Sequence, residues 1–162
     1  MITVRKAMSL DTGSMARLLN DIIAQGGTTA MTRPVTAADL EEFMSYDPPR
    51  SAWHVALDDV EDVQGFQWIE PNPNLPPDAC DIATFVRIGK TGLGIGSSLF
   101  DASRKAAAEL GYAWINANIR ADNEGGLVYY QSRGFRDYGM IEGHVLESGK
   151  VVDKILKRYD VK

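Results

Sequence analysis

The sequence has a single cysteine, Cys80, and no apolar run long enough to cross a membrane. One cysteine excludes an internal disulfide, and a chain without disulfides is typical of a reducing compartment, so we expect a cytoplasmic location. A membrane-spanning helix needs about 18 or more consecutive apolar residues, so no membrane partner is expected. Residues 1–5 also lack the apolar core of a signal peptide.

Basic residues are outnumbered as well, with 17 Lys and Arg against 22 Asp and Glu and a net charge of −5. Nucleic-acid binders usually carry a basic excess, so no nucleic-acid partner is expected. The two histidines, His54 and His144, stand alone without metal-ligand spacing, and no metal site is predicted. The length of 162 residues and the 44% of hydrophobic residues are typical of one soluble domain, so we treat 1–162 as a single domain.

Strand-like and helix-like segments follow one another in a mixed order. Apolar periodicity, capping residues and turn signals predict strands at 2–7, 53–57, 63–69, 80–88, 112–119, 135–141 and 151–159, and helices at 11–24, from 36 to before 48, at 95–110 and from 123 to about 133. A hairpin with an acidic tip precedes a central strand–helix–strand unit. This order predicts a mixed α/β fold of the α+β type.

The most distinctive stretch is a glycine-rich turn between the strand at 80–88 and the helix that follows. Gly92, Gly94 and Gly96 fall at every second position, where the missing Cβ permits positive φ and close approach of a ligand. Their amides would add to the free N–H groups at the helix start, which is an anion-binding arrangement. An ordinary strand–helix turn is the simpler alternative. The predicted diphosphate cradle consists of Thr91, Gly92, Leu93, Gly94, Ile95, Gly96 and Ser97.

Two motifs in this order resemble the GNAT superfamily of N-acetyltransferases. The first is the strand–turn–helix of residues 85–99, in which Thr-Gly-Leu-Gly-Ile-Gly takes the place of the family's pyrophosphate loop. The second is residues 123–135, in which an Asn, a Tyr on a helix and a Gly-Phe pair match the family. Gly89 and Thr91 depart from the usual Arg or Gln, which leaves main-chain groups to bind the diphosphate. Within the superfamily, residues 81–86 and the chain's start look most like the phosphinothricin and methionine-sulfone acetyltransferases.

The resemblance implies a central mixed, mostly antiparallel twisted sheet flanked by helices, with a splayed strand pair that holds acetyl-CoA. It implies an N-acetyltransferase that acts on a primary amine of a small molecule, an amino acid or amino-acid analogue, by direct attack in a ternary complex. Proteins of this fold are often dimers, so the resemblance also suggests a second copy of the chain as a partner, in a homodimer. No metal cofactor is implied.

The resemblance assigns donor-side roles to individual residues. The main chain of Phe85, Val86 and Arg87 would pair with the pantetheine arm, and one amide there would polarise the thioester carbonyl. Tyr130 would contact the cofactor and act as general acid for the leaving thiolate, although a core tyrosine is the simpler interpretation. Asn123 would contact the cofactor or cap its helix, and the two roles are compatible.

Acceptor-side roles follow from the resemblance in the same way. Asp81 falls where the phosphinothricin-like group carries a catalytic carboxylate and would take a proton from the amine. The alternative is a solvated residue at the start of a strand, and Glu70 and Glu124 are weaker candidates for the base. Arg33 is suited to pair with a substrate carboxylate, and a surface arginine is its simpler interpretation. The residues expected to face the acceptor are Thr28, Arg33 and Trp68.

Two other functions fit parts of the pattern. Gly92, Gly94 and Ser97 approach the fingerprint of a Rossmann-type dinucleotide binder, but the third glycine and a ribose-binding acid are missing. A non-catalytic acyl-CoA-binding module of the GNAT fold would share the whole cradle. The variant Tyr130→Phe separates that module from an enzyme, because only an enzyme would lose rate.

Overall fold

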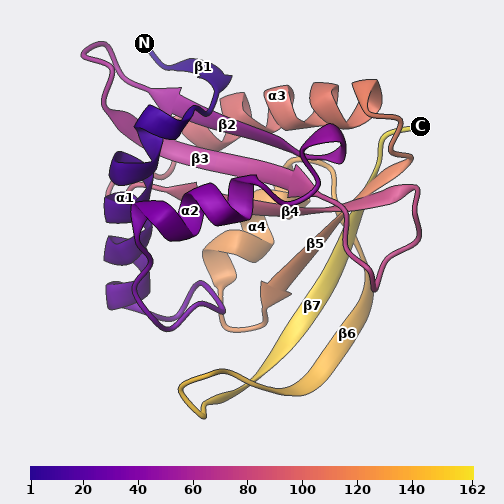
Figure 1. Ribbon diagram of the computed structural model, residues 1–162. Helices are drawn as coiled ribbons and strands as arrows, with labels where there is room; N and C mark the ends of the chain where they lie inside the picture. Colours follow the sequence, from indigo (N-terminus) through magenta and orange to yellow (C-terminus); the bar gives the residue numbers. More distant parts are fainter.

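The computed structural model describes residues 1–162, and its strands form one seven-stranded sheet with helices on both faces (Figure 1). The strand order is β1-β2-β3-β4-β5-β7-β6, and every neighbouring pair is antiparallel except β4 and β5. The strands are β1 (Thr3–Lys6), β2 (Ala52–Leu57), β3 (Val63–Glu70), β4 (Ala79–Val86), β5 (Trp114–Arg120), β6 (Arg136–Val145) and β7 (Val151–Asp160). The helices are α1 (Thr12–Gln25), α2 (Ala37–Met44), α3 (Ile95–Glu109) and α4 (Glu124–Ser132), with 3-10 turns η1 (Ser9–Asp11) and η2 (Pro48–Arg50).

The predicted mixed α/β architecture is confirmed, and so is the order of its elements. A Rossmann-type parallel sheet is excluded, because a single strand pair is parallel. Three predicted strand ends were wrong by two residues or more. The strand expected to begin at residue 112 begins at Trp114. The strand expected to reach residue 88 stops at Val86, where the amide of Lys90 donates to the carbonyl of Arg87 in a turn. The strand expected to stop at residue 141 continues to Val145, because it pairs with β7 along an exposed edge that has no apolar pattern to mark its length.

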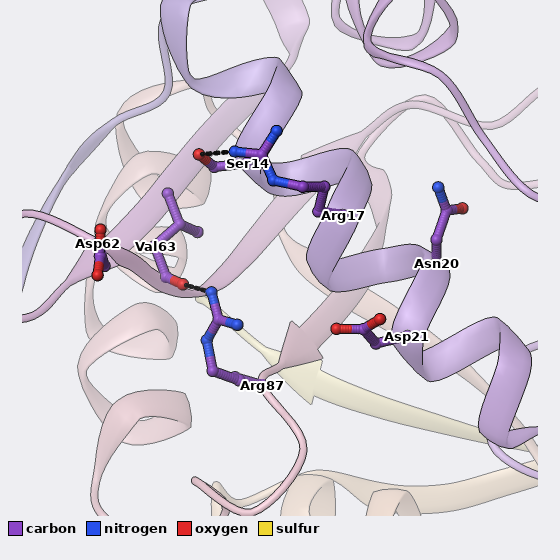
Figure 2. A pocket seen from close by; sticks show the side chains of 7 residues that line it. All are labelled: Ser14, Arg17, Asn20, Asp21, Asp62, Val63 and Arg87. Carbon is purple, nitrogen blue, oxygen red and sulfur yellow. Dashed lines mark hydrogen bonds between the residues drawn. The ribbon is translucent and has the colours of Figure 1, made fainter.

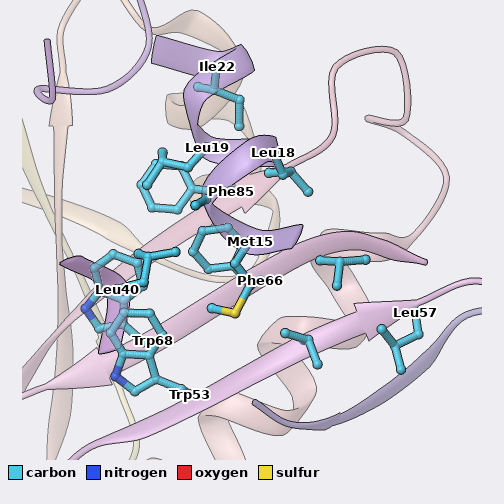
Figure 3. Packing of buried hydrophobic residues seen from close by; sticks show 13 residues of the cluster. Met15, Leu18, Leu19, Ile22, Leu40, Trp53, Leu57, Phe66, Trp68 and Phe85 are labelled. Atoms are coloured by element: carbon cyan, nitrogen blue, oxygen red, sulfur yellow. The ribbon is translucent and has the colours of Figure 1, made fainter. Parts of the chain in front are cut away.

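α1 and α2 cover one face of β2, β3 and β4. Side-chain alternation along β3 places Phe66 and Trp68 on this face, where they meet Trp53 of β2 and Phe85 of β4 (Figure 3). The Trp53 and Trp68 rings are stacked with centroids 4.0 Å apart, and Phe85 lies 5.7 Å from Trp68. This aromatic cluster fixes β4 against its neighbours in the sheet.

α3 and α4 cover the opposite face. Ile115, Ala117 and Ile119 share one face of β5, and all three lie buried beneath these helices. α3 packs closely because Ser103 and Ala107, its residues against the sheet, are small and fully buried. No helix is both long and apolar enough to cross a membrane.

The parallel pairing of β4 with β5 is short. It covers three residue pairs and ends at Asp81 opposite Asn116. Beyond this point β4 continues to Val86 and β5 to Arg120 without pairing to each other. The predicted splayed strand pair is therefore present, and the glycine-rich turn and the start of α4 lie at its open end (Figure 1).

Candidate active site

The opening between β4 and β5 is a cleft of about 860 Å³. Its walls come from β4, the glycine-rich turn, the end of β5, α4 and the segment 28–31 between α1 and α2. A cleft of this volume is in the range that holds a cofactor or small ligand. It therefore brings together segments that are far apart in the sequence.

The edge of β4 that faces the cleft has free main-chain groups. The amide of Arg87 donates to the carbonyl of Gln64 on β3 at 2.8 Å. Hydrogen bonding alternates along an antiparallel pair, so Phe85 also bonds to β3, while the main-chain groups of Thr84 and Val86 face the gap. Of the three residues expected to bind the pantetheine arm, Val86 therefore turns its amide into the cleft.

The side chain of Arg87 leaves the cleft altogether. Its terminal nitrogen donates to the carbonyl of Val63 at 2.6 Å, and the guanidinium faces a separate polar pocket of about 470 Å³ beside α1 (Figure 2). That pocket also contains Arg17, Asp21 and Asp62 (Figure 2). The cleft therefore receives no positive charge from Arg87.

The glycine-rich turn leaves the start of α3 open. Gly92 and Gly94 have φ of +82° and +83°, which other residues adopt only with strain, and Gly94 is the N-cap of α3 without a capping side chain. The first-turn amides of α3 are therefore free for an anion. Thr91, Gly92, Gly94, Gly96 and Ser97 line the cleft, whereas the Leu93 side chain is exposed and that of Ile95 is buried in the core.

Gly96 is needed for a different reason from the other two glycines. It lies inside α3, and it is not among the glycines with positive φ. A Cβ at this position would lie 2.6 Å from the Cε1 atom of Tyr129, so a side chain cannot be accommodated without moving that ring. The hydroxyl of Tyr129 donates to the carbonyl of Gly96 at 2.7 Å. The turn is thus tied directly to α4.

Tyr130 reaches the cleft from α4. Its side chain is 7% exposed, and its hydroxyl lies 2.7 Å from Oγ1 of Thr84. Burial raises the pKa of the Tyr130 phenol above its usual value, so the group is a neutral proton donor at physiological pH. Asn123 caps α4 by accepting from the amide of Gly126, and its Nδ2 donates to the carbonyl of Thr28 across the cleft. Both Asn123 and Thr28 line the cleft.

Asp81 lies at the closed end of the splay, on the sheet face opposite Thr84 because the two positions are three residues apart in one strand. Its carboxylate accepts from Nδ2 of Asn72 at 2.6 Å and from Nδ2 of Asn116 at 2.7 Å, so it is held in place rather than free in solvent. The hydroxyl of Tyr138 donates in turn to Oδ1 of Asn116.

Glu70 is the cross-strand partner of Asp81. Burial raises the pKa of the Glu70 carboxyl, and the negative charge of Asp81 adds to the rise. Nε1 of Trp68 donates to Glu70 at 2.6 Å and so orients it. Two carboxyl groups therefore lie side by side where the splay between β4 and β5 closes, and neither is among the residues that line the cleft.

Three further candidates for the acceptor side or the base are also absent from the cleft lining. Trp68 is 6% exposed within the aromatic cluster, and its Nε1 donates to Glu70. Arg33 is exposed and forms an ion pair with Glu147 of the β6–β7 hairpin, with Nε 2.9 Å from Oε2. Glu124 begins α4 and is not among the lining residues.

The sequence did not predict two residues that belong to this region. Lys154 of β7 lines the cleft without a carboxylate in ion-pair distance, and burial lowers the pKa of its ammonium. Gln67 of β3 is fully buried and donates to Thr84 and to Tyr129. A glutamine between Phe66 and Trp68 in an otherwise apolar strand was the signal that pointed to a buried polar contact.

Comparison with known proteins places this geometry in a class. No family model matches the chain. The Bacillus subtilis (strain 168) protein named "Putative phosphinothricin acetyltransferase YwnH" is 28% identical over 160 residues, which are 97% of this chain and 98% of that protein. A crystal structure of "a putative phosphinothricin N-acetyltransferase" is 25% identical with a TM-score of 0.87, and the match covers 100% of this chain and 99% of the other.

A third similarity shows the same fold with a ligand. The GNAT superfamily phosphinothricin acetyltransferase from Sinorhizobium meliloti, solved in complex with AcCoA, has a TM-score of 0.88 at 19% identity, over 98% of this chain and 88% of that one. The chain therefore shares the fold of a GNAT superfamily acetyltransferase, and it is similar in sequence to proteins named as phosphinothricin acetyltransferases. The resemblance predicted from its two motifs is confirmed by these similarities.

Proposed function

We propose that this acetyltransferase transfers the acetyl group of acetyl-CoA to the primary amine of an amino acid or amino-acid analogue, by direct attack in a ternary complex. The observation that carries the proposal is the convergence of three features on one cleft: the free main chain of β4, the uncapped start of α3 and the Tyr130 hydroxyl. Acetyl-CoA carries a matching group for each feature: a pantetheine arm for β4, a diphosphate for α3 and a thioester sulfur for Tyr130.

On the donor side, the first-turn amides of α3 would bind the diphosphate and the edge of β4 would pair with the pantetheine arm. An amide of Thr84 or Val86 would polarise the thioester carbonyl, and a preorganised donor of this kind lowers a barrier by about 3–4 kcal/mol. Tyr130 would protonate the thiolate as it leaves. The amides of Leu93 and Ile95 and the cofactor contact of Asn123 also belong to the proposed donor site, whereas the main-chain groups of Phe85 and Arg87 are directed to β3.

On the acceptor side, the amine must lose a proton before it attacks. An α-amino group with a pKa near 8 gives it up at a cost of about 1.4 kcal/mol at neutral pH, whereas a lysine-like amine near pKa 10.4 costs about 4–5 kcal/mol. Asp81 is proposed as the base, with Glu70 beside it as a second carboxyl whose raised pKa favours proton uptake. This chemistry suits an α-amino acid.

The experiment that tests the proposal measures thiol release from acetyl-CoA with a panel of amino acids, amino-acid analogues and simple amines. Turnover is expected with acceptors that carry an α-amino group, and acetyl-CoA is expected to raise the melting temperature because it binds the native state alone. Stabilisation by acetyl-CoA without turnover on any amine would favour the non-catalytic acyl-CoA-binding module instead. NAD in place of acetyl-CoA serves as the control ligand.

Lys154→Met is expected to raise the KM for an amino acid about tenfold, because a charge-assisted hydrogen bond to a carboxylate contributes about 1.5–3 kcal/mol and the site is partly open to solvent. The unpaired ammonium of Lys154 in the cleft suits an acceptor carboxylate. Steady-state kinetics with an amino acid and with the matching amine that lacks the carboxylate give the comparison, and the second KM should not change.

The matched control is Lys150→Met, since Lys150 is an exposed lysine of the same hairpin whose Nζ lies 3.5 Å from Asp122. Its variant should leave both KM values unaltered. If Lys154→Met changes the KM for the amino acid and the KM for the matching amine equally, Lys154 does not recognise the carboxylate.

A further inference from the structure

A chain of hydrogen bonds runs through the sheet from the glycine-rich turn to Tyr130. The Tyr129 hydroxyl donates to the carbonyl of Gly96, and Nε2 of Gln67 donates to the Tyr129 oxygen at 3.0 Å. The same Nε2 donates to Oγ1 of Thr84 at 2.8 Å, and Thr84 lies 2.7 Å from the Tyr130 hydroxyl. Gln67 is the branching point of this chain and is fully buried.

The orientation of the Gln67 amide follows from Tyr129. A phenol has one hydrogen, and Tyr129 uses it on the carbonyl of Gly96. Its oxygen must therefore receive a hydrogen from Gln67, which places the –NH₂ end of the amide, with its two hydrogens, toward Tyr129 and Thr84. Oε1 of Gln67 is buried without a partner, so the side chain is held for its two donors rather than for its oxygen.

The next bond joins the hydroxyls of Thr84 and Tyr130, and either of them can be its donor. Oγ1 of Thr84 accepts from Gln67, so its own single hydrogen is available to the Tyr130 oxygen. When Thr84 donates, the phenolic hydrogen of Tyr130 is free to point into the cleft, where Tyr130 and Thr84 are both lining residues.

We propose that Gln67 is a positioning residue which, through Thr84, aims the Tyr130 hydrogen at the departing thiolate and stabilises the phenolate that forms. The inference rests on the proposed function, in which Tyr130 is the acid. In that step the Tyr130 O–H bond breaks as the S–H bond of the coenzyme A thiol forms, and the phenolate regains a proton from water after the products leave. The hydrogen bond from Thr84 strengthens as the phenol becomes a phenolate.

Charge development at Tyr130 makes this support necessary. Burial disfavours the phenolate of Tyr130, and the hydrogen bond from Thr84 acts in the opposite direction. No cationic side chain is among the groups that shift the pKa of Tyr130, so the neutral hydrogen bonds from Gln67 and Thr84 are what the protein supplies to offset the charge. The same chain of hydrogen bonds also connects Tyr130 to the glycine-rich turn, which is proposed to bind the diphosphate.

The test combines variants at three positions. Gln67→Leu and Thr84→Val remove the donors with little change of volume. Each is expected to lower kcat about 3- to 10-fold, because it removes the contribution of one buried hydrogen bond. The KM for acetyl-CoA should stay the same. Thr84→Ser keeps the hydroxyl and should restore most of the rate. In a Tyr130→Phe background, neither Gln67→Leu nor Thr84→Val should lower kcat further, because both act through the phenol.

A second measurement does not depend on turnover. The ultraviolet absorbance of the thiolate reports the pKa of the coenzyme A thiol in the complex. This pKa should rise in Gln67→Leu and Thr84→Val, because Tyr130 is no longer oriented to donate to the thiolate. The control is Gln64→Leu, another buried glutamine of β3 whose Nε2 reaches Asp58 instead. It should change neither kcat nor the thiol pKa.

The outcomes separate the two proposals. Equal losses in the presence and absence of the Tyr130 hydroxyl, or a thiol pKa that does not respond, would overturn the role of Gln67 while leaving the acetyltransferase proposal intact. If the wild-type protein acetylates none of the amines, the proposed function fails, and the thiol pKa alone then decides whether the chain from Gln67 orients Tyr130.

Discussion

Tyr130→Phe is expected to lower kcat about 100-fold, at the lower end of the 10²–10⁴ that a positioned general acid contributes, with the KM for acetyl-CoA nearly unchanged. The hydroxyl is buried in the cleft beside Thr84, and its raised pKa keeps it protonated up to alkaline pH. The ring would keep its edge contacts with Tyr129 and Phe135, whose centroids lie 4.9 and 5.1 Å away, so packing should survive the change.

The measurement is the kcat for thiol release with the best acceptor of the panel, together with the melting temperature of each variant. Tyr46→Phe is the control, since that tyrosine is 43% exposed and its hydroxyl has no hydrogen-bond partner in the protein. A Tyr130→Phe protein that turns over at the wild-type rate would mean that water protonates the thiolate and that Tyr130 is a core tyrosine.

Phe66→Ala should reduce the free energy of unfolding by about 3–5 kcal/mol, the range measured for truncating buried aromatic residues. Phe66 is fully buried in the cluster between α1 and β3, with its ring 5.2 Å from Phe85 and 6.1 Å from Trp68 (Figure 3). The neighbouring rings sit on two different strands, so they cannot collapse together to fill the space without shifting the sheet. For a chain of this length the loss corresponds to a decrease of roughly 10 °C in melting temperature.

Urea unfolding of the wild type and the variant gives the difference directly. Val60→Ala provides the comparison, because Val60 is 75% exposed at the β2–β3 hairpin and surface changes usually stay within about 0.5 kcal/mol. A loss below about 1 kcal/mol for Phe66→Ala would show that the aromatic cluster repacks easily and does not hold β4 in place.

Local pattern was enough to predict the sequence of elements and the place of the glycine-rich turn. Gly92 and Gly94 adopt the positive φ that only glycine takes without strain. These features depend on neighbours in the chain. The capping box of Thr36 and Asp39 at the start of α2 is local in the same way, since both of its hydrogen bonds join residues close in sequence.

Features that depend on contacts between residues far apart in the sequence could not be predicted from it. The reason for Gly96 is a ring 33 positions away, and the ion pair of Arg33 is made with Glu147 on the other side of the sequence. Lys154 was one of several lysines near the end of the chain, and only the arrangement of β5 and β7 turns it toward the cleft. No periodicity in a single strand carries that information.

The short join between β4 and β5 also has a kinetic consequence. The hairpins β2–β3, β3–β4 and β6–β7 close short loops, so each half of the sheet contains strand pairs that are local in sequence. The join brings together residues 35 positions apart, such as Asp81 and Asn116, and the entropy of closing a loop rises with its length. We therefore expect these hairpins to pair before the join forms, and the proposed site at the splay to be completed only after them.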